Sequence, residues 1–244
     1  VALGQPIAEP REHNSPPALR ALARRAFAQN RPQEAAQLWL EQSQEPASRN
    51  DLLLVASGLA RAGDSRAPAY IDKLRRRWNV DAEAALALWN FYGGRPADAV
   101  EPLLAAIELW RVNPWANLNL AMAAIGLSGE LAARDAAAGR TLYQSLARPF
   151  AVQVLESQRR TARIQIARRV DFPGLCMAAF EVFEPHPPWI HDFLQQRATC
   201  YRGAQSPLAP LAERDLARFE ESMPPVLWET GVAGAALSSE SIPP

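Results

Sequence analysis

Few side chains in this 244-residue sequence are arranged for acid–base or metal chemistry. His191 and Asp192 are neighbours in a predicted helical segment, where they would be the best acid–base or metal-binding pair. Adjacent residues of a helix point about 100° apart, and no third ligand lies near them in the sequence. We therefore interpret the pair as surface residues. The alternative is a stand-alone helical hydrolase centred on His191 and Asp192.

Carboxylate pairs and nucleophile motifs give no stronger signal. The pairs Glu220 with Glu221 and Glu181 with Glu184 lie near predicted helix ends, where they are expected to be solvated. The chain has no GxSxG nucleophile elbow and no GxGxxG or GxxxxGK[ST] phosphate loop. The sequence thus predicts a protein that is not an enzyme, with no catalytic residue, no metal and no cofactor.

Cys176 and Cys200 are the only cysteines, and they form no CxxC pair of the kind found in zinc or redox sites. Each is flanked by apolar residues. Buried free thiols are the preferred interpretation, because free cysteine behaves as a small hydrophobe. A disulfide between them is the alternative, and it would indicate a location outside the cytoplasm.

The charge balance argues against a general attraction to nucleic acid or to an anionic membrane. The chain has 26 basic and 26 acidic residues, so its formal net charge is zero. Arginines are nevertheless concentrated in one predicted helix, against a single Glu156: Arg159, Arg160, Arg163, Arg168 and Arg169. A solvated face bridged to acidic neighbours is the preferred interpretation and an anion or nucleic-acid surface the alternative. Aromatic residues that would stack on bases are missing there, which favours no nucleic acid.

Turn-like sites recur along the first 148 residues. They are Asn30-Arg31-Pro32, Gly63-Asp64-Ser65, Gly94-Arg95-Pro96 and Ser128-Gly129-Glu130, with spacings of 33, 31 and 34 residues. An alanine- and leucine-rich run precedes and follows each one, so each period predicts two helices joined by a tight turn. The predicted helices are 19–29 and 33–44, 52–62 and 66–78, 82–92 and 97–110, and 117–127 and 132–146.

This pattern resembles the tetratricopeptide repeat in its spacing and in its small residues beside the turn. The residues that carry the resemblance are Leu19, Leu22, Ala23, Asn30, Ala35 and Trp39 in the first repeat, Leu86, Ala87, Gly94, Ala99, Leu103 and Ala106 in the third, and Leu120, Ala121, Ala124 and Ala133 in the fourth. The resemblance implies an all-α fold, an α-α superhelix or solenoid of helical hairpins with a diverged helical cap at its C-terminal end.

The domain organisation follows from where the period starts and stops. Residues 1–17 are proline-rich and predict a linker, and residues 18–148 predict four helix pairs. Residues 149–223 keep a helical composition, with helices expected at 150–169, 173–183, 189–202 and 208–223, the last two as a possible fifth, diverged repeat. Residues 224–244 predict a flexible tail, although Val226, Leu227 and Trp228 could dock back.

The resemblance also implies a binding surface, since the first helices of tetratricopeptide repeats line a concave groove that receives a peptide or a helix. The groove residues expected by position are Arg20, Arg24, Phe27, Ser57, Arg61, Leu88, Phe91, Tyr92, Asn119 and Met122. Arginines with aromatics nearby would suit a segment that carries a carboxylate and an apolar side chain. The alternative is that the aromatic rings merely fill space between helices.

The expected function is a protein-interaction scaffold that binds a partner protein or peptide in a bacterial assembly or envelope process. A regulatory or substrate-presenting appendage of a larger membrane-associated enzyme, such as a glycosyltransferase or polymerase, is the alternative. No apolar stretch approaches the roughly 18 residues of a membrane span. The start at Val1 without Met suggests a piece of a longer protein, with an upstream domain or anchor. This start and the two cysteines favour a periplasmic or membrane-tethered location, which otherwise stays open.

Overall fold

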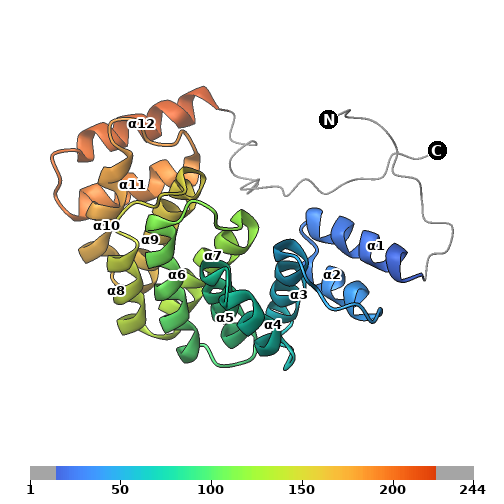
Figure 1. The fold of residues 1–244 in the computed structure, drawn as a ribbon. Helices are drawn as coiled ribbons and strands as arrows, with labels where there is room; N and C mark the ends of the chain where they lie inside the picture. The colour runs from blue at the N-terminus through green and yellow to red at the C-terminus, as the bar shows by residue number, and fades with distance from the viewer. Residues whose placement is uncertain (1–14, 224–244) are drawn as a thin grey trace, which may run out of the picture. The chain divides into compact units, whose positions relative to one another are not determined.

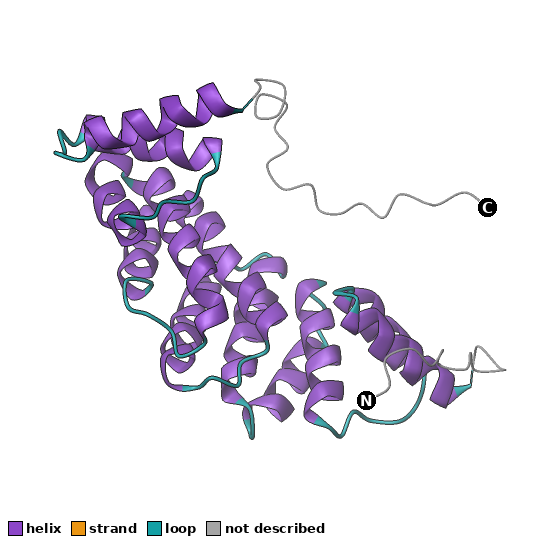
Figure 2. Ribbon diagram, turned by 90° about the horizontal axis from the view of Figure 1, so that it is seen from above, coloured by secondary structure: helices purple, strands orange, loops and turns teal. Residues whose placement is uncertain are grey.

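A computed structural model describes residues 15–223, and in this part of the chain every regular element is a helix (Figures 1 and 2). The all-α prediction is therefore confirmed. The chain divides into two compact units, the first ending at Val170 and the second beginning at Asp171. The first 14 residues of the expected linker and the whole expected tail lie outside the described residues.

From residue 15 onward, where the description of the chain begins, the first unit contains nine α-helices, of which the first eight form four consecutive pairs (Figure 1). They are α1 (Pro16–Ala28) with α2 (Pro32–Leu40), α3 (Arg49–Arg61) with α4 (Ala67–Arg75), α5 (Asn79–Tyr92) with α6 (Val100–Val112), and α7 (Leu118–Arg134) with α8 (Ala136–Ser145). The ninth helix is α9 (Glu156–Val170), and short 3-10 turns lie at η1 (Ala97–Ala99) and η2 (Gln153–Leu155).

Proline and serine set the start of α1 two residues before the expected domain boundary. Pro16 and Pro17 occupy the first turn of the helix, where a missing backbone N–H costs nothing. The Ser15 hydroxyl accepts a hydrogen bond from the backbone N–H of Ala18. These two prolines, expected in the linker, therefore belong to the helix.

Three of the four predicted turns have the same backbone geometry. Asn30, Gly63 and Gly94 have positive φ values of 57°, 64° and 79°. After each of them, the next backbone N–H reaches back to a carbonyl in the last turn of the preceding helix, as Asp64 does to Leu59 at 3.0 Å. This is the Schellman ending, which requires a residue that tolerates the left-handed conformation. The repeated turn signal in the sequence is thus a repeated helix ending.

The fourth predicted turn is wrong. Ser128, Gly129 and Glu130 lie inside α7, which continues to Arg134. Ser128 and Gly129 are buried, and a Cβ at Gly129 would lie 3.4 Å from the Gln165 side chain of α9. Gly129 therefore lies at the contact between α7 and α9 and not in a turn. The break falls at Asp135, whose carboxylate accepts hydrogen bonds from the N–H groups of Ala137 and Ala138.

The core of the first unit lies between neighbouring helices. The first helices of successive pairs contact one another in a row, α1 with α3, α3 with α5, α5 with α7 and α7 with α9. Alanines such as Ala23, Ala56 and Ala87 are buried there, as their size requires at a close helix crossing. At Gly58 the approach is closer still, since a Cβ would lie 2.1 Å from the Pro32 carbonyl oxygen of α2.

The arginines of α9 form only in part the solvated face, bridged to acidic neighbours, that the sequence suggested. Arg159 is buried, forms an ion pair with Glu156 at 2.7 Å and donates to the Leu146 carbonyl at 2.6 Å. Arg163 is buried with its guanidinium 4.4 Å from the ring centre of Tyr143. Arg160 is partly exposed and lies 3.9 Å from Glu156, and the exposed Arg168 and Arg169 line a shallow hollow with Glu130.

Up to residue 223, where the described part of the chain ends, the second unit contains three α-helices, α10 (Phe172–Phe180), α11 (His191–Gly203) and α12 (Ala209–Ser222), with a 3-10 turn η3 (Glu181–Phe183). Cys176 of α10 and Cys200 of α11 form a disulfide, so the preferred prediction of free thiols is wrong. The two cysteines lie on α10 and α11, which pack against each other, and their separation of 24 residues in the sequence gave no sign of that proximity.

A buried ion network also holds the second unit together. Arg197 is fully buried and donates two hydrogen bonds to Glu184, at 2.6 and 3.0 Å, and one to Asp215 at 2.7 Å. The Tyr201 hydroxyl donates to Glu184 at 2.8 Å, and burial together with this bond raises the pKa of Tyr201. Glu184, expected to be solvated, is therefore a structural counter-ion.

Candidate binding site

Two adjoining hollows lie on the side of the first unit formed by α1, α3 and the start of α7. The arginine hollow, of about 470 Å³, is lined by Arg24, Phe27, Ala28, Ser48, Asn50, Asp51 and Leu54. The tryptophan hollow, of about 630 Å³, is lined by Arg49, Asn50, Leu53, residues 114–119, Val152 and Val154. Asn50 belongs to both, so the two hollows form one continuous surface, which we call the hollow pair.

Asp51 holds the Arg24 side chain in place in the wall of the arginine hollow. It is buried at the start of α3, and its two carboxylate oxygens accept hydrogen bonds from the Arg24 guanidinium at 2.9 and 3.1 Å. Burial alone would raise the pKa of Asp51, but hydrogen bonds from Arg24 and Ser48 outweigh it and hold the pKa below its ordinary value. The guanidinium also lies 5.5 Å from the centre of the Trp39 ring. Arg24 is thus neutralised within the protein.

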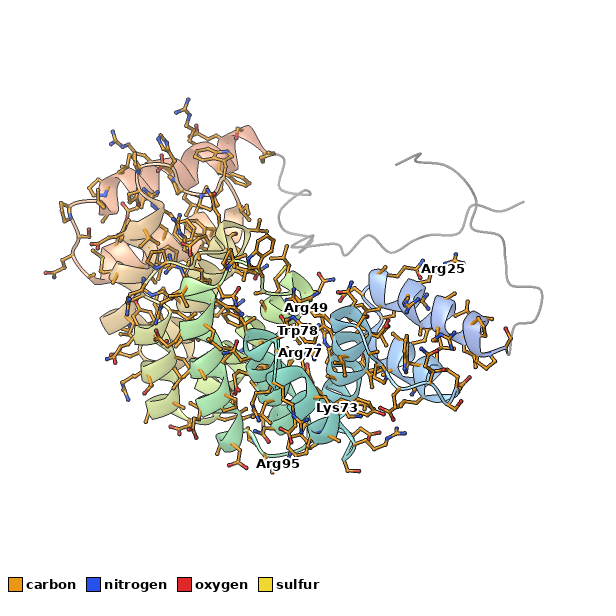
Figure 3. All side chains as sticks on the ribbon, viewed as in Figure 1. Arg25, Arg49, Lys73, Arg77, Trp78 and Arg95 are labelled. Atoms are coloured by element: carbon orange, nitrogen blue, oxygen red, sulfur yellow. A yellow bond between two sulfur atoms is a disulfide. The ribbon has the colours of Figure 1, made fainter. Side chains whose placement is uncertain are left out.

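Asp81 plays the same part for the tryptophan hollow. It is 1% exposed, and one oxygen accepts from Arg49 at 3.0 and 2.6 Å while the other accepts from the Asn117 backbone N–H at 2.9 Å. Arg49 also donates to the Trp115 carbonyl. Figure 3 shows Arg49 between the ribbons of α3 and α7. One buried carboxylate on α5 therefore ties the start of α3 to the loop that carries Trp115.

That loop exposes apolar side chains instead of burying them. Trp115 is 75% exposed, and Leu118 and Val154 beside it are also exposed. Asn113 and Asn117 fix the backbone, since Asn113 accepts from the Trp115 N–H and Asn117 from the Leu120 N–H. An indole held out to solvent on an ordered backbone can bury a large apolar area when a partner covers it, without first having to be ordered.

Four of the ten predicted groove residues lie in or beside the hollow pair. Arg24 and Phe27 line the arginine hollow, and Asn119 lines the tryptophan hollow. Arg61 donates to the Asn119 carbonyl at 3.3 Å. Residues 114–118 were missed because sequence reasoning placed the surface on helices, and the signal that could have found them is a tryptophan inside a Pro-Trp-Ala-Asn turn.

The other six predicted residues divide into exposed and buried ones. Met122 and Tyr92 are exposed, the half-buried Phe91 packs edge-on against Tyr92, and Arg20 donates to Gln42. Ser57 and Leu88 are buried in the core, where the Ser57 hydroxyl donates to the Leu54 carbonyl. These two residues therefore do not face a groove, because α3 and α5 turn their positions toward neighbouring helices.

The histidine region does not form the pair weighed from the sequence. His191 lies 3.1 Å from Glu220 of α12, and Asp192 accepts from Gln196. Among the described residues no group of histidine, cysteine and carboxylate side chains could hold a metal ion. Within residues 15–223, no helix has both the length and the apolar character that a membrane span needs.

Comparison with known proteins does not place the chain in a family. No protein-family model matches the sequence, and no curated protein and no solved structure matches it either. The function must therefore be argued from the hollow pair.

Proposed function

We propose that the first unit is a protein-interaction domain whose hollow pair binds an extended segment of a partner protein. The observation that carries the proposal is the exposed, backbone-anchored Trp115 with Leu118 and Val154 at the mouth of a hollow of about 630 Å³. Exposed apolar side chains grouped around a concavity are typical of binding surfaces, whereas single ones are ordinary surface residues.

The arrangement of the helices supports an extended ligand. The row of first helices is continuous from α1 to α9, and the hollow pair runs along part of it from α1 to the start of α7. The three equal turns and the regular contacts between successive first helices favour a tetratricopeptide-like superhelix for this unit. In such a stack a peptide crosses several repeats and makes a small contact with each.

Hydrogen exchange with a selected peptide tests the proposal. Random 12-residue peptides displayed on phage are panned against the full chain, and the tightest binder is added before exchange into D₂O. Amides of residues 114–119 and of the first turn of α3 should exchange more slowly with peptide, and those of α8 should not change. Protection elsewhere, without protection of residues 114–119, would show that the hollow pair is not the binding surface.

A further inference from the structure

One guanidinium beside the tryptophan hollow has no counter-ion among residues 15–223. Arg24 and Arg49 each form an ion pair with a buried aspartate, Asp51 and Asp81 respectively. Arg61, at the end of the same helix α3, has only a hydrogen bond of 3.3 Å to the Asn119 carbonyl. Its Nε is buried and has no hydrogen-bond partner among the described residues. Because the Nε is buried, an incoming carboxylate would bind the terminal nitrogens of the guanidinium and supply the missing counter-charge there.

The described groups around Arg61 also provide no negative charge to offset its own positive charge. Burial lowers its pKa and the nearby Tyr92 acts in the opposite direction, while no carboxylate contributes. On the first helices α1, α3, α5 and α7, the carboxylates of Asp51, Asp81 and Glu83 are all paired with arginines. Within the described part of these four helices, Glu130 is then the one acidic residue without an ion pair. The arginines without an ion pair on the same helices are Arg20, Arg25, Arg61 and Arg134.

From this complementarity we infer that the segment bound in the hollow pair is acidic, and that Arg61 binds an aspartate or glutamate carboxylate of the partner. Arg61 reaches the wall of the tryptophan hollow through Asn119, so the carboxylate would lie next to the apolar side chain that covers Trp115 and Leu118. A carboxylate matches the planar fork of donors on the guanidinium. The inference rests on the proposed function and specifies its ligand.

Peptide selection followed by titration tests it. Random 12-residue peptides on phage are panned against the full chain, and the selected pool should be enriched in Asp and Glu relative to the starting library. For a selected acidic peptide, Arg61→Gln should raise the dissociation constant about tenfold or more, as expected for a lost charge-assisted hydrogen bond. Arg61→Lys should keep part of the affinity, because it keeps the charge and loses the fork.

Arg25→Gln is the matched control. Arg25 is an exposed arginine of α1 that projects away from the ribbon in Figure 3 and lines neither hollow. Its loss should change the dissociation constant by less than about twofold, the scale of a screened surface charge. Replacing the acidic peptide residue by its amide should weaken binding to the wild-type chain as much as Arg61→Gln does. In the Arg61→Gln variant, the same replacement in the peptide should cause no further loss of affinity.

The outcomes separate this inference from the proposed function. If binding depends on Trp115 but the selected peptides are not acidic, or Arg61→Gln leaves their affinity unchanged, the inference is overturned and the proposed function stands. Binding that is indifferent to Trp115 as well, or no binding peptide at all, overturns both. Self-association of the chain that disappears in Arg61→Gln would assign the surface to a second copy and would also overturn the inference.

Discussion

The Arg49 guanidinium donates two hydrogen bonds to one oxygen of Asp81, a residue 32 positions later in the chain that is 1% exposed. The other oxygen accepts the backbone N–H of Asn117. A single carboxylate on α5 thereby positions the first residue of α3 and the loop before α7, which together form the wall of the tryptophan hollow. The shape of the candidate binding surface thus depends on Asp81, a side chain that is itself buried.

Asp81→Asn should lower the free energy of unfolding by about 2–4 kcal/mol, because it leaves Arg49 without a counter-ion in a mostly buried position. Urea denaturation followed by circular dichroism measures the change. Asp98→Asn is the control, since Asp98 is 65% exposed and 3.9 Å from its arginine. That substitution should cost less than about 0.5 kcal/mol. Equal effects of the two substitutions would show that the Asp81 network is not stabilising.

Two glycines in helices should respond in opposite ways to alanine. At Gly58 a Cβ would meet the Pro32 carbonyl oxygen at 2.1 Å and the Ala36 Cβ at 2.5 Å, so Gly58→Ala must push α2 from α3. We expect a loss of about 1–3 kcal/mol. At Gly126 nothing lies within 4 Å, and Gly126→Ala should stabilise α7 by up to about 1 kcal/mol. Melting temperatures that move in the same direction would contradict the packing described for α2 and α3.

The disulfide should stabilise the second unit. Changing Cys176 and Cys200 together to serine should lower the stability of this unit by about 3 kcal/mol, the usual scale for a closed loop of this size. Because the two sulfurs are bonded, mass spectrometry of the chain unfolded without a reductant should find no cysteine that has reacted with iodoacetamide. Two alkylated cysteines without a reductant would show that the bond is not formed.

Acid should weaken the arginine hollow in a defined way. The folded-state pKa of Asp51 is lowered, so its contribution to stability is fully present above the unfolded-state pKa of about 4. This contribution is lost as the pH falls through the lower, folded-state value. Asp51→Asn should therefore be less stable than wild type at pH 7, and the gap should narrow as the pH falls below about 4. A gap that stays constant down to pH 2 would contradict the pairing with Arg24.

Much of the fold was readable from the sequence because one physical requirement repeats. Asn30, Gly63 and Gly94 tolerate positive φ, and a chain that ends helices in this way must place such residues at the endings. The same logic failed at Gly129, since glycine also serves where two helices touch. Gln205, with φ of 52°, makes the same kind of ending after α11 without any glycine signal.

The candidate site was only partly readable, for a different reason. Arg24, Phe27, Arg61 and Asn119 were predicted because the resemblance to the tetratricopeptide repeat implies a groove lined by the first helix of each pair. Pairings such as Arg49 with Asp81 join residues far apart in the chain, and a sequence pattern does not state which arginine is neutralised. Only the structure shows that Arg24 is paired with a carboxylate, Asp51, whereas Arg61 donates to a backbone carbonyl.

Affinity for a panned peptide, measured by fluorescence polarisation for two alanine variants, tests the central claim most directly. Trp115→Ala removes the exposed indole at the tryptophan hollow, whereas Val112→Ala trims an equally exposed apolar side chain at the end of α6 that lines neither hollow. The account predicts that Trp115→Ala raises the dissociation constant about tenfold or more, as for a central aromatic anchor, and that Val112→Ala leaves it within about twofold of wild type. Equal affinities of wild type and Trp115→Ala would contradict it.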